Sequence, residues 1–230
     1  MKFILILLIF ALIFALPIIL LIKNKEKLNI KFVFVGLLMY LVFRILLYPF
    51  IGLFANNLTV LAKSIIDVIY LLVYILIVKR LIFTKVFHLS SEDKDKLFSS
   101  GLTESTIEVL LVFLPNLLNL GAYFFLLEFG NIYDALETSF TANQIQEYVT
   151  YLNSIGYDYF MFLGLMIIAL YLFNITNNYL LVNNAKLSFV YSLVLYVTYF
   201  VLALLNKWIA CIILIGLITS IYYINSKERI

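Results

Sequence analysis

FILILLIFALIFALPIILLI, residues 3–22, is a run of 20 residues without a charged side chain. An α-helix of about 20 apolar residues crosses the roughly 30 Å hydrocarbon layer of a bilayer. The run is longer than the apolar core of a secretory signal, which is about 7–15 residues, and no small-x-small cleavage site follows it. We therefore expect residues 3–22 to be a transmembrane helix and not a cleaved leader.

Six further apolar segments are long enough to cross a membrane as helices. They are 32–53, 59–78, 107–127, 158–177, 187–205 and 208–225. Apolar residues make up 65% of the 230 residues and charged residues 13%, against roughly 45–50% and 25% in soluble domains. Backbone groups in lipid must satisfy their own hydrogen bonds, and the period-two alternation of a barrel is absent, so helices are expected.

These segments predict an all-α fold, a polytopic transmembrane bundle of about seven helices that forms a single domain over 1–230. We expect a multi-pass protein of the cell membrane whose surroundings are the lipid bilayer, with no nucleic-acid partner.

The basic residues are distributed unevenly along the chain. The first connection carries Lys23, Lys25, Lys27 and Lys31, the third Lys79, Arg80, Lys85, Lys94 and Lys96, the fifth Lys186, and the tail Lys227 and Arg229. Cytoplasmic loops are enriched in Lys and Arg, so we predict an outside N-terminus and a cytoplasmic C-terminus. The longest outer loop, 128–157, then holds four acids and no Lys or Arg, its acids being Glu128, Asp134, Glu137 and Glu147.

Two connections have local helix signals. In the outer loop, Ile145, Tyr148, Val149 and Leu152 recur at helical spacing, which predicts an amphipathic helix within 139–156 that packs over the helix ends. In the cytoplasmic stretch 86–104, the sequence Ser-Ser-Glu-Asp-Lys at 90–94 is typical of a helix start.

Arg44, Asp67 and Glu108 stand inside apolar segments. A charge at bilayer depth costs at least about 2.5–3.5 kcal/mol, so it normally faces a partner in the protein interior. We expect Arg44 to pair with Asp67 on the neighbouring antiparallel helix, while Lys63, one turn from Asp67, extends outward. The alternative is that Asp67 lines a polar cavity or acts as a relay group.

Glu104 and Glu108 lie one turn apart at the entrance of the fourth segment. Glu104 has the place of a helix-start acid that complements the helix dipole. Glu108 lies deeper, and structural and functional roles are equally open. Pro115 follows and is expected to kink the helix, with Asn116 and Asn119 near the freed carbonyl.

The remaining reactive residues give little support to catalysis. The sole histidine, His88, falls in a charged loop and is expected to be solvated. An HExxH metal site needs two histidines on one helix face, which this chain cannot supply. Its one cysteine, Cys211, excludes a Cys-based metal site.

The order of features resembles the YhfC-type intramembrane metalloproteases, distant relatives of the CAAX-processing glutamate proteases. Leu16-Pro17-Ile18, the lysine-rich turn, Phe34-Val35-Gly36 and the run from Phe43 to Pro49 resemble the family's first two helices. The segment 101–108, GLTESTIE, resembles its Gly-x-Gly-His-Gly-x-x-Glu element, and 185–195 is placed like its penultimate helix.

The ligand residues depart from that family. Glu104 stands where the motif histidine is expected, and the histidine of the sixth helix is missing. Glu108 matches directly, while Ile66-Asp67 stands where the family has a Glu-Glu pair. The resemblance thus implies Glu108, Glu104 and Asp67 as catalytic candidates, with a divalent metal as cofactor only if the protein is a protease. An all-carboxylate set suits zinc poorly.

Three hypotheses follow. The first is a catalytically degenerate member of this scaffold that binds a membrane peptide or a partner protein. The second is an active intramembrane protease, metal-dependent or of the glutamate type. The third is a small solute transporter, or its membrane subunit, with a mid-depth site. Candidate binding residues are Arg44, Asn116 and Asn119.

Overall fold

The computed structural model describes residues 1–55 and 58–228, and in these residues the regular secondary structure is entirely helical. Seven helices in the described residues are long and apolar enough to cross a membrane. They are Lys2–Lys23, Ile30–Phe50, Val60–Val86, Lys94–Phe129, Tyr157–Asn183, Ala185–Leu205 and Lys207–Glu228. The predicted fold class is confirmed, and the chain is a multi-pass membrane protein.

Several of these spans are divided by wider, π-helical turns. The segments are α1 (Lys2–Lys23), α2 (Ile30–Tyr40), η2 (Leu41–Leu47), α3 (Tyr48–Ala55), α4 (Val60–Val73), η3 (Tyr74–Lys79), η4 (Ile82–Val86), α5 (Lys94–Glu108), η5 (Val109–Phe113), α6 (Leu114–Phe129), α9 (Tyr157–Asn183), α10 (Ala185–Val197), η6 (Thr198–Leu202), α11 (Ala203–Leu205) and α12 (Lys207–Glu228). Short helices η1 (Lys25–Lys27), α7 (Ile132–Leu136) and α8 (Ala142–Ser154) lie in connections.

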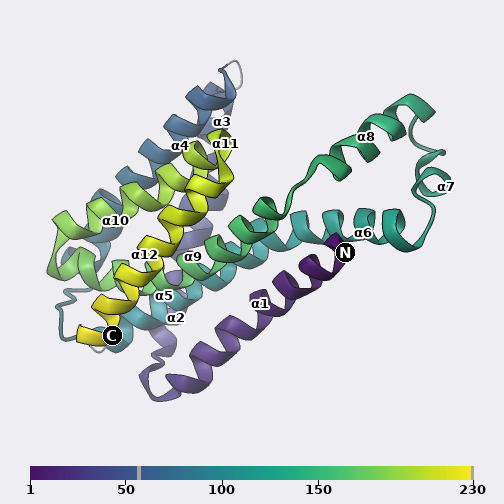
Figure 1. The fold of residues 1–230 in the computed structure, drawn as a ribbon. Helices are drawn as coiled ribbons and strands as arrows, with labels where there is room; N and C mark the ends of the chain where they lie inside the picture. Colours follow the sequence, from purple (N-terminus) through teal and green to yellow (C-terminus); the bar gives the residue numbers. More distant parts are fainter. Residues whose placement is uncertain (56–57, 229–230) are drawn as a thin grey trace.

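Helix α9 is the centre of the bundle (Figure 1). Of its most apolar stretch 61% is buried, against 17–33% in the other six spans. It packs against α1, α5, α10 and α12. Its buried asparagines, Asn174, Asn177 and Asn178, fit this position, because polar side chains are costly against lipid and face the bundle interior.

Helix α5 packs between α2 and α9 at very short distance. A Cβ atom on Gly36 of α2 would come within 2.5 Å of the Ser100 carbonyl oxygen. On the other side of α5, a Cβ on Gly101 would lie 2.6 Å from the Asn174 carbonyl oxygen. Small residues let helix backbones approach in this way, and such packing drives helix association in lipid.

The fourth span is longer than predicted. Its start was expected at residue 107, but the helix begins at Lys94 and runs 36 residues to Phe129, about 54 Å at 1.5 Å per residue. The helix-start signal at 90–94 is confirmed, since α5 begins at Lys94. The polar residues of α5 can enter the bundle because their hydroxyls bond internally: the Ser105 hydroxyl donates to the carbonyls of Gly101 (2.9 Å) and Leu170 (3.1 Å).

The third span also extends beyond its expected end at residue 78, reaching Val86. Lys79, expected in the cytoplasmic connection, therefore lies within a helix and is buried. His88 follows in an exposed turn, as expected for a solvated histidine, with φ at 51°.

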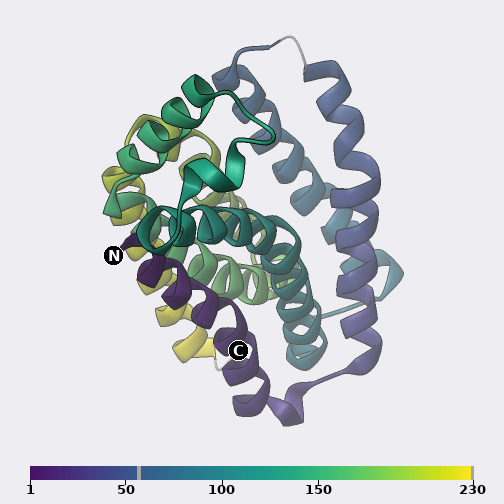
Figure 2. The same cartoon turned by 90° about the vertical axis from the view of Figure 1, so that its right-hand side faces the viewer.

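The amphipathic helix predicted within 139–156 is confirmed as α8, which opens with a capping box between Thr141 and Gln144. Figure 1 shows α7 and α8 beyond the N-terminal end of α1 and the end of α6, and in Figure 2, which views the molecule from this side, the same segment lies in front. Ile145 and Leu152 of α8 are buried against the protein. The Lys2 ammonium donates to the Leu152 carbonyl at 3.1 Å, so the end of α8 is tied to the start of α1.

The basic connections gather at one end of the molecule, near the C-terminus (Figure 1). There the Lys94 ammonium contacts the Glu228 carbonyl, and the Asn29 amide donates to the Ser99 hydroxyl at 2.8 Å. Which end faces the cytoplasm stays a prediction from the positive charges.

Candidate functional site

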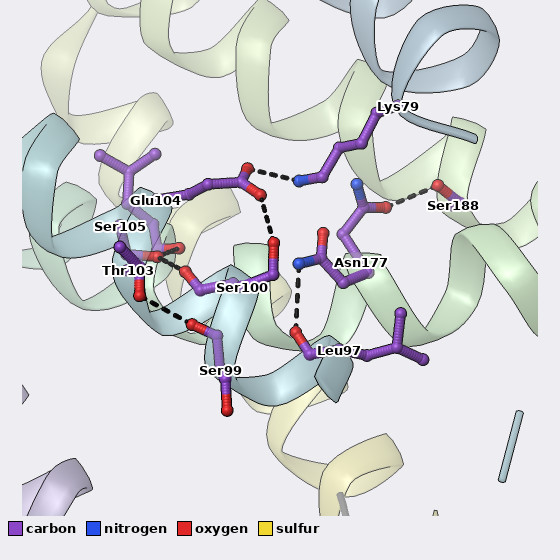
Figure 3. Close-up of polar contacts among 12 residues, drawn as sticks. Lys79, Leu97, Ser99, Ser100, Thr103, Glu104, Ser105, Asn177 and Ser188 are labelled. Carbon is purple, nitrogen blue, oxygen red and sulfur yellow. Dashed lines mark hydrogen bonds and ion pairs between the residues drawn. The ribbon is translucent and has the colours of Figure 1, made fainter. Parts of the chain in front are cut away.

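The most deeply buried ion pair joins η3 to α5. The Lys79 ammonium lies 2.5 Å from a Glu104 carboxylate oxygen, and the two side chains are 1% and 7% exposed. The other carboxylate oxygen of Glu104 accepts a hydrogen bond of 3.0 Å from the Ser100 hydroxyl. Figure 3 shows Glu104 reaching from α5 toward Lys79, with Asn177 and Ser188 nearby. Every oxygen of this buried carboxylate therefore has a partner.

A second ion pair lies one helical turn further along α5. The Arg44 guanidinium of η2 donates to Glu108 at 2.9 Å, with side chains 12% and 11% exposed. The expected pairing of Arg44 with Asp67 is wrong, since the guanidinium binds the carboxylate that α5 brings to its depth. The buried Asp67 instead accepts a hydrogen bond of 2.7 Å from the Tyr48 hydroxyl.

Both ion pairs line one small closed cavity. Its lining residues are Tyr40, Arg44, Leu71, Tyr74, Ile75, Lys79, Glu104, Glu108, Asn174 and Tyr196. The cavity volume is about 20 Å³, and one buried water requires roughly 10–15 Å³. The Tyr74 hydroxyl is buried without a hydrogen-bond partner among the described residues. The cavity has room for a single water, which could form a hydrogen bond with the Tyr74 hydroxyl.

Three asparagines of α9 add to this polar interior, and the sequence analysis missed them. Asn174 lines the cavity, the Asn177 side-chain oxygen accepts from the Ser188 hydroxyl at 2.6 Å, and Asn178 donates to the Leu97 carbonyl at 3.2 Å. Their spacing of i, i+3 and i+4 within an apolar run is a signal that could have identified them.

The predicted site residues separate into three groups. Arg44, Glu104 and Glu108 meet at the small cavity. Asp67 is buried but is not part of the cavity lining. Asn116 and Asn119 are exposed on α6, and the Asn116 amide donates to the Val112 carbonyl at 2.8 Å. Asn116 therefore bonds within its own helix, and neither asparagine lines the cavity of the ion pairs.

The carboxylates do not make a metal site. Among the residues that the structure describes, no three His, Cys, Asp or Glu side chains are grouped so that they could hold a metal ion. Glu104 is neutralised by Lys79, and Glu108 by Arg44. A metal ligand must offer a free lone pair to the ion, and an adjacent ammonium or guanidinium competes for the same oxygens. The donor set does not fit the metal that the family resemblance implies.

A larger cavity lies at the other end of the molecule, between α6 and the α7–α8 segment. It has a volume of about 270 Å³. Its lining residues are Tyr123, Leu136, Phe140, Gln144, Ile145 and Tyr148. Burial raises the pKa of Tyr148 above its ordinary value, so this phenol stays neutral at physiological pH. The cavity is mostly apolar, with an amide and phenol groups as its polar atoms.

Comparisons of the chain with protein families, with curated proteins and with solved structures find no match.

Proposed function

We propose that this multi-pass protein binds a membrane peptide or a partner protein, and that the binding site is the cavity between α6, α7 and α8. In this proposal the chain sits in the cell membrane and keeps a scaffold similar to the YhfC-type proteases without their chemistry. In this proposal the ion pairs stabilise the helix bundle, and the α6–α8 cavity binds the ligand.

The observation that carries the proposal is the contrast between the two cavities in volume and in the exposure of their lining side chains. The α6–α8 cavity has about 270 Å³ and an exposed side chain, Phe140, in its wall. Pockets for small ligands have about 300–1,000 Å³, so this volume accepts one or two side chains of a larger ligand. An anchor side chain that enters a pocket is the usual centre of a peptide or protein interface.

The protease hypothesis has weaker support. A general base must reach the water that it activates, and Glu108 shares its carboxylate with Arg44. The cavity beside it, at about 20 Å³, has no room for a peptide bond. Purified protein that binds a divalent metal, and loses a proteolytic activity on Glu108→Gln, would favour the protease over the binding protein.

The transport hypothesis has no supporting observation of its own. A substrate at mid-depth needs a polar site along its path, and here Arg44 is already paired with Glu108. Stabilisation of the protein by a metabolite, lost on Asp67→Asn, would support a transporter.

The binding proposal can be tested in intact membranes with the full chain. A photoreactive phenylalanine analogue replaces Phe140, and in a control it replaces Leu118, which is also exposed but lies on α6 away from the cavity. We expect a discrete cross-linked polypeptide only from position 140. Ile145→Trp, which fills the cavity, should abolish it, whereas Leu118→Trp should not. Equal cross-linking from both positions, insensitive to Ile145→Trp, would contradict the proposal.

A further inference from the structure

The α7–α8 segment carries negative charge that forms no ion pair with the cations of the described residues. Residues 129–157 contain Asp134, Glu137 and Glu147 and no Lys, Arg or His. All three acids are exposed, and within the described part of the chain none of them forms an ion pair. Their charge is therefore available to a ligand from outside.

The cations nearest in the structure are already engaged elsewhere. The Lys2 ammonium donates to the carbonyls of Leu152 and of Asn153, the second at 2.8 Å. The N-terminal ammonium pairs with Glu128. These groups hold α1 to the C-terminal end of α8 and to the end of α6, and in the described residues neither forms an ion pair with Asp134, Glu137 or Glu147.

One of the three acids, Glu137, adjoins the apolar cavity. Glu137 lines a shallow hollow that shares Phe140, Gln144 and Ile145 with the cavity wall. Asp134 and Glu147 belong to the same two helices, α7 and α8. A ligand whose apolar side chain enters the cavity would have its neighbouring residues beside these carboxylates.

Aromatic rings in the same place also favour positive charge. The Tyr123 and Tyr148 rings lie edge to face at 4.9 Å between centroids, and Tyr148 and Tyr151 lie 6.1 Å apart. The faces of such rings attract Lys and Arg side chains. The apolar cavity, the aromatic faces and the carboxylates together fit a ligand that has both apolar and cationic side chains.

We propose that the ligand of this site is a cationic amphipathic peptide segment, in which an apolar side chain fills the cavity and adjacent Lys or Arg side chains meet Glu137 and its acidic neighbours. This inference rests on the proposed binding function and adds the charge of the ligand. Charge complementarity at the rim of an apolar site selects partners and speeds their arrival. Anionic lipid headgroups would be repelled by the same carboxylates.

The test uses the full chain in nanodiscs of phosphatidylcholine, which carries no net charge. Three labelled helical peptides share one apolar face and have Lys, Ser or Glu at all polar positions, and their binding is measured against empty nanodiscs. Each exposed charge pair adds little by itself, and the three acids together lead us to expect the Lys peptide to bind about tenfold more tightly than the Ser peptide, and the Glu peptide most weakly. The preference should shrink in 0.5 M salt.

Matched variants locate the effect. Asp134→Asn, Glu137→Gln and Glu147→Gln together should remove the preference for the Lys peptide. Glu26→Gln, Glu92→Gln and Asp95→Asn together remove the same charge from exposed positions at the opposite end and should leave the preference intact.

The possible failures can be told apart. If Lys and Ser peptides bind equally and both lose binding on Ile145→Trp, the charge inference is wrong while the binding function stands. If no peptide shows binding that depends on Ile145, the proposed function itself fails. If phosphocholine displaces both peptides equally, the cavity belongs to a lipid headgroup, and the inference is overturned.

Discussion

Four largely buried charged groups between η2, η3 and α5 form ion pairs, whereas among the described residues no cation pairs with the acids on α7 and α8. Arg44, Lys79, Glu104 and Glu108 form two ion pairs at most 12% exposed. Asp134, Glu137 and Glu147 are exposed and unpaired among the described residues. Carboxylates are thus buried and paired in one region of the chain, and exposed and unpaired in the other.

The difference follows from the surroundings of each region. In the bundle an unpaired charge would pay most of its desolvation cost, so these four charges are held as two ion pairs, and the buried Asp67 carboxylate accepts from the Tyr48 hydroxyl. In the connection that water reaches, an unpaired carboxylate costs little and its field remains available to a ligand. We therefore expect the buried, paired charges to affect stability and the exposed, unpaired acids to affect binding.

We expect the largest loss of stability when one charge is removed from the most deeply buried ion pair. Lys79→Met leaves the Glu104 carboxylate buried and uncompensated, so we expect a loss of about 3–5 kcal/mol in the free energy of unfolding. Thermal unfolding of the purified protein in detergent measures the change.

A double variant separates the lost pair from the stranded charge. Lys79→Met combined with Glu104→Met replaces both partners with apolar side chains, and most of the stability should return, because replacing a whole buried pair is often neutral. A single variant as stable as the wild type would show that the Lys79–Glu104 contact has no role in the bundle.

The second effect concerns the packing that brings the pairs together. Gly36→Ala places a Cβ 2.5 Å from the Ser100 carbonyl oxygen, and relieving such overpacking costs about 1–3 kcal/mol. The control is Gly216→Ala, where a Cβ meets nothing within 4 Å and alanine should help the helix by roughly 0.5–1 kcal/mol. Unfolding in detergent compares the two, and equal effects would mean that the α2–α5 approach is not tight.

Hydropathy was sufficient for the fold but not for the length of the spans. The run 3–22 can be assigned as a membrane span from its hydropathy alone, because 20 uncharged residues in a row are not stable in water. Residues 94–106 cannot be assigned in this way: they are polar, and they enter the bundle because residues such as Ser99, Gly101 and Ser105 contact neighbouring backbones. Tertiary packing of this kind leaves no trace in a hydropathy pattern.

The same limit applies to the site. Arg44 and Glu108 were recognisable because each interrupts an apolar segment. The sequence could not show which acid pairs with Arg44. Asp67 and Glu108 both lie at a suitable depth, and the rotation of the helices decides between them. Lys79 was missed because it stands beside Arg80 at the end of an apolar run. A lysine in that position usually reaches the membrane surface.

A third prediction compares two tyrosine hydroxyls with different acceptors. Tyr48 donates to the carboxylate of Asp67, whereas Tyr70 donates to the neutral Phe43 carbonyl. Hydrogen bonds to charged groups contribute about 1.5–3 kcal/mol and neutral ones about 0.5–1.5. In thermal unfolding, Tyr48→Phe should therefore cost more than Tyr70→Phe. The reverse order would mean that the Tyr48–Asp67 contact contributes less to stability than the Tyr70–Phe43 contact.

The smallest effect is expected at the exposed start of α5. The Asp93 carboxylate accepts from the Lys96 ammonium at 2.6 Å and from the Ser90 amide at 2.9 Å. The Lys96 contact, followed by the Ser90 amide, holds the pKa of Asp93 below its ordinary 3.8. A depressed pKa means that this stabilisation is present above about pH 4 and disappears as the pH falls through the folded-state pKa.

Asp93→Asn should therefore lower stability at pH 7 by only about 0.2–1 kcal/mol, since solvent screens the pair. The difference between variant and wild type should vanish when unfolding is measured in acid. Asp95→Asn is the matched control, because it removes a charge from the same first turn without the Ser90 and Lys96 contacts. A cost at Asp93 as large as that of Lys79→Met would mean that exposed and buried pairs contribute alike, and the contrast between the two regions would no longer hold.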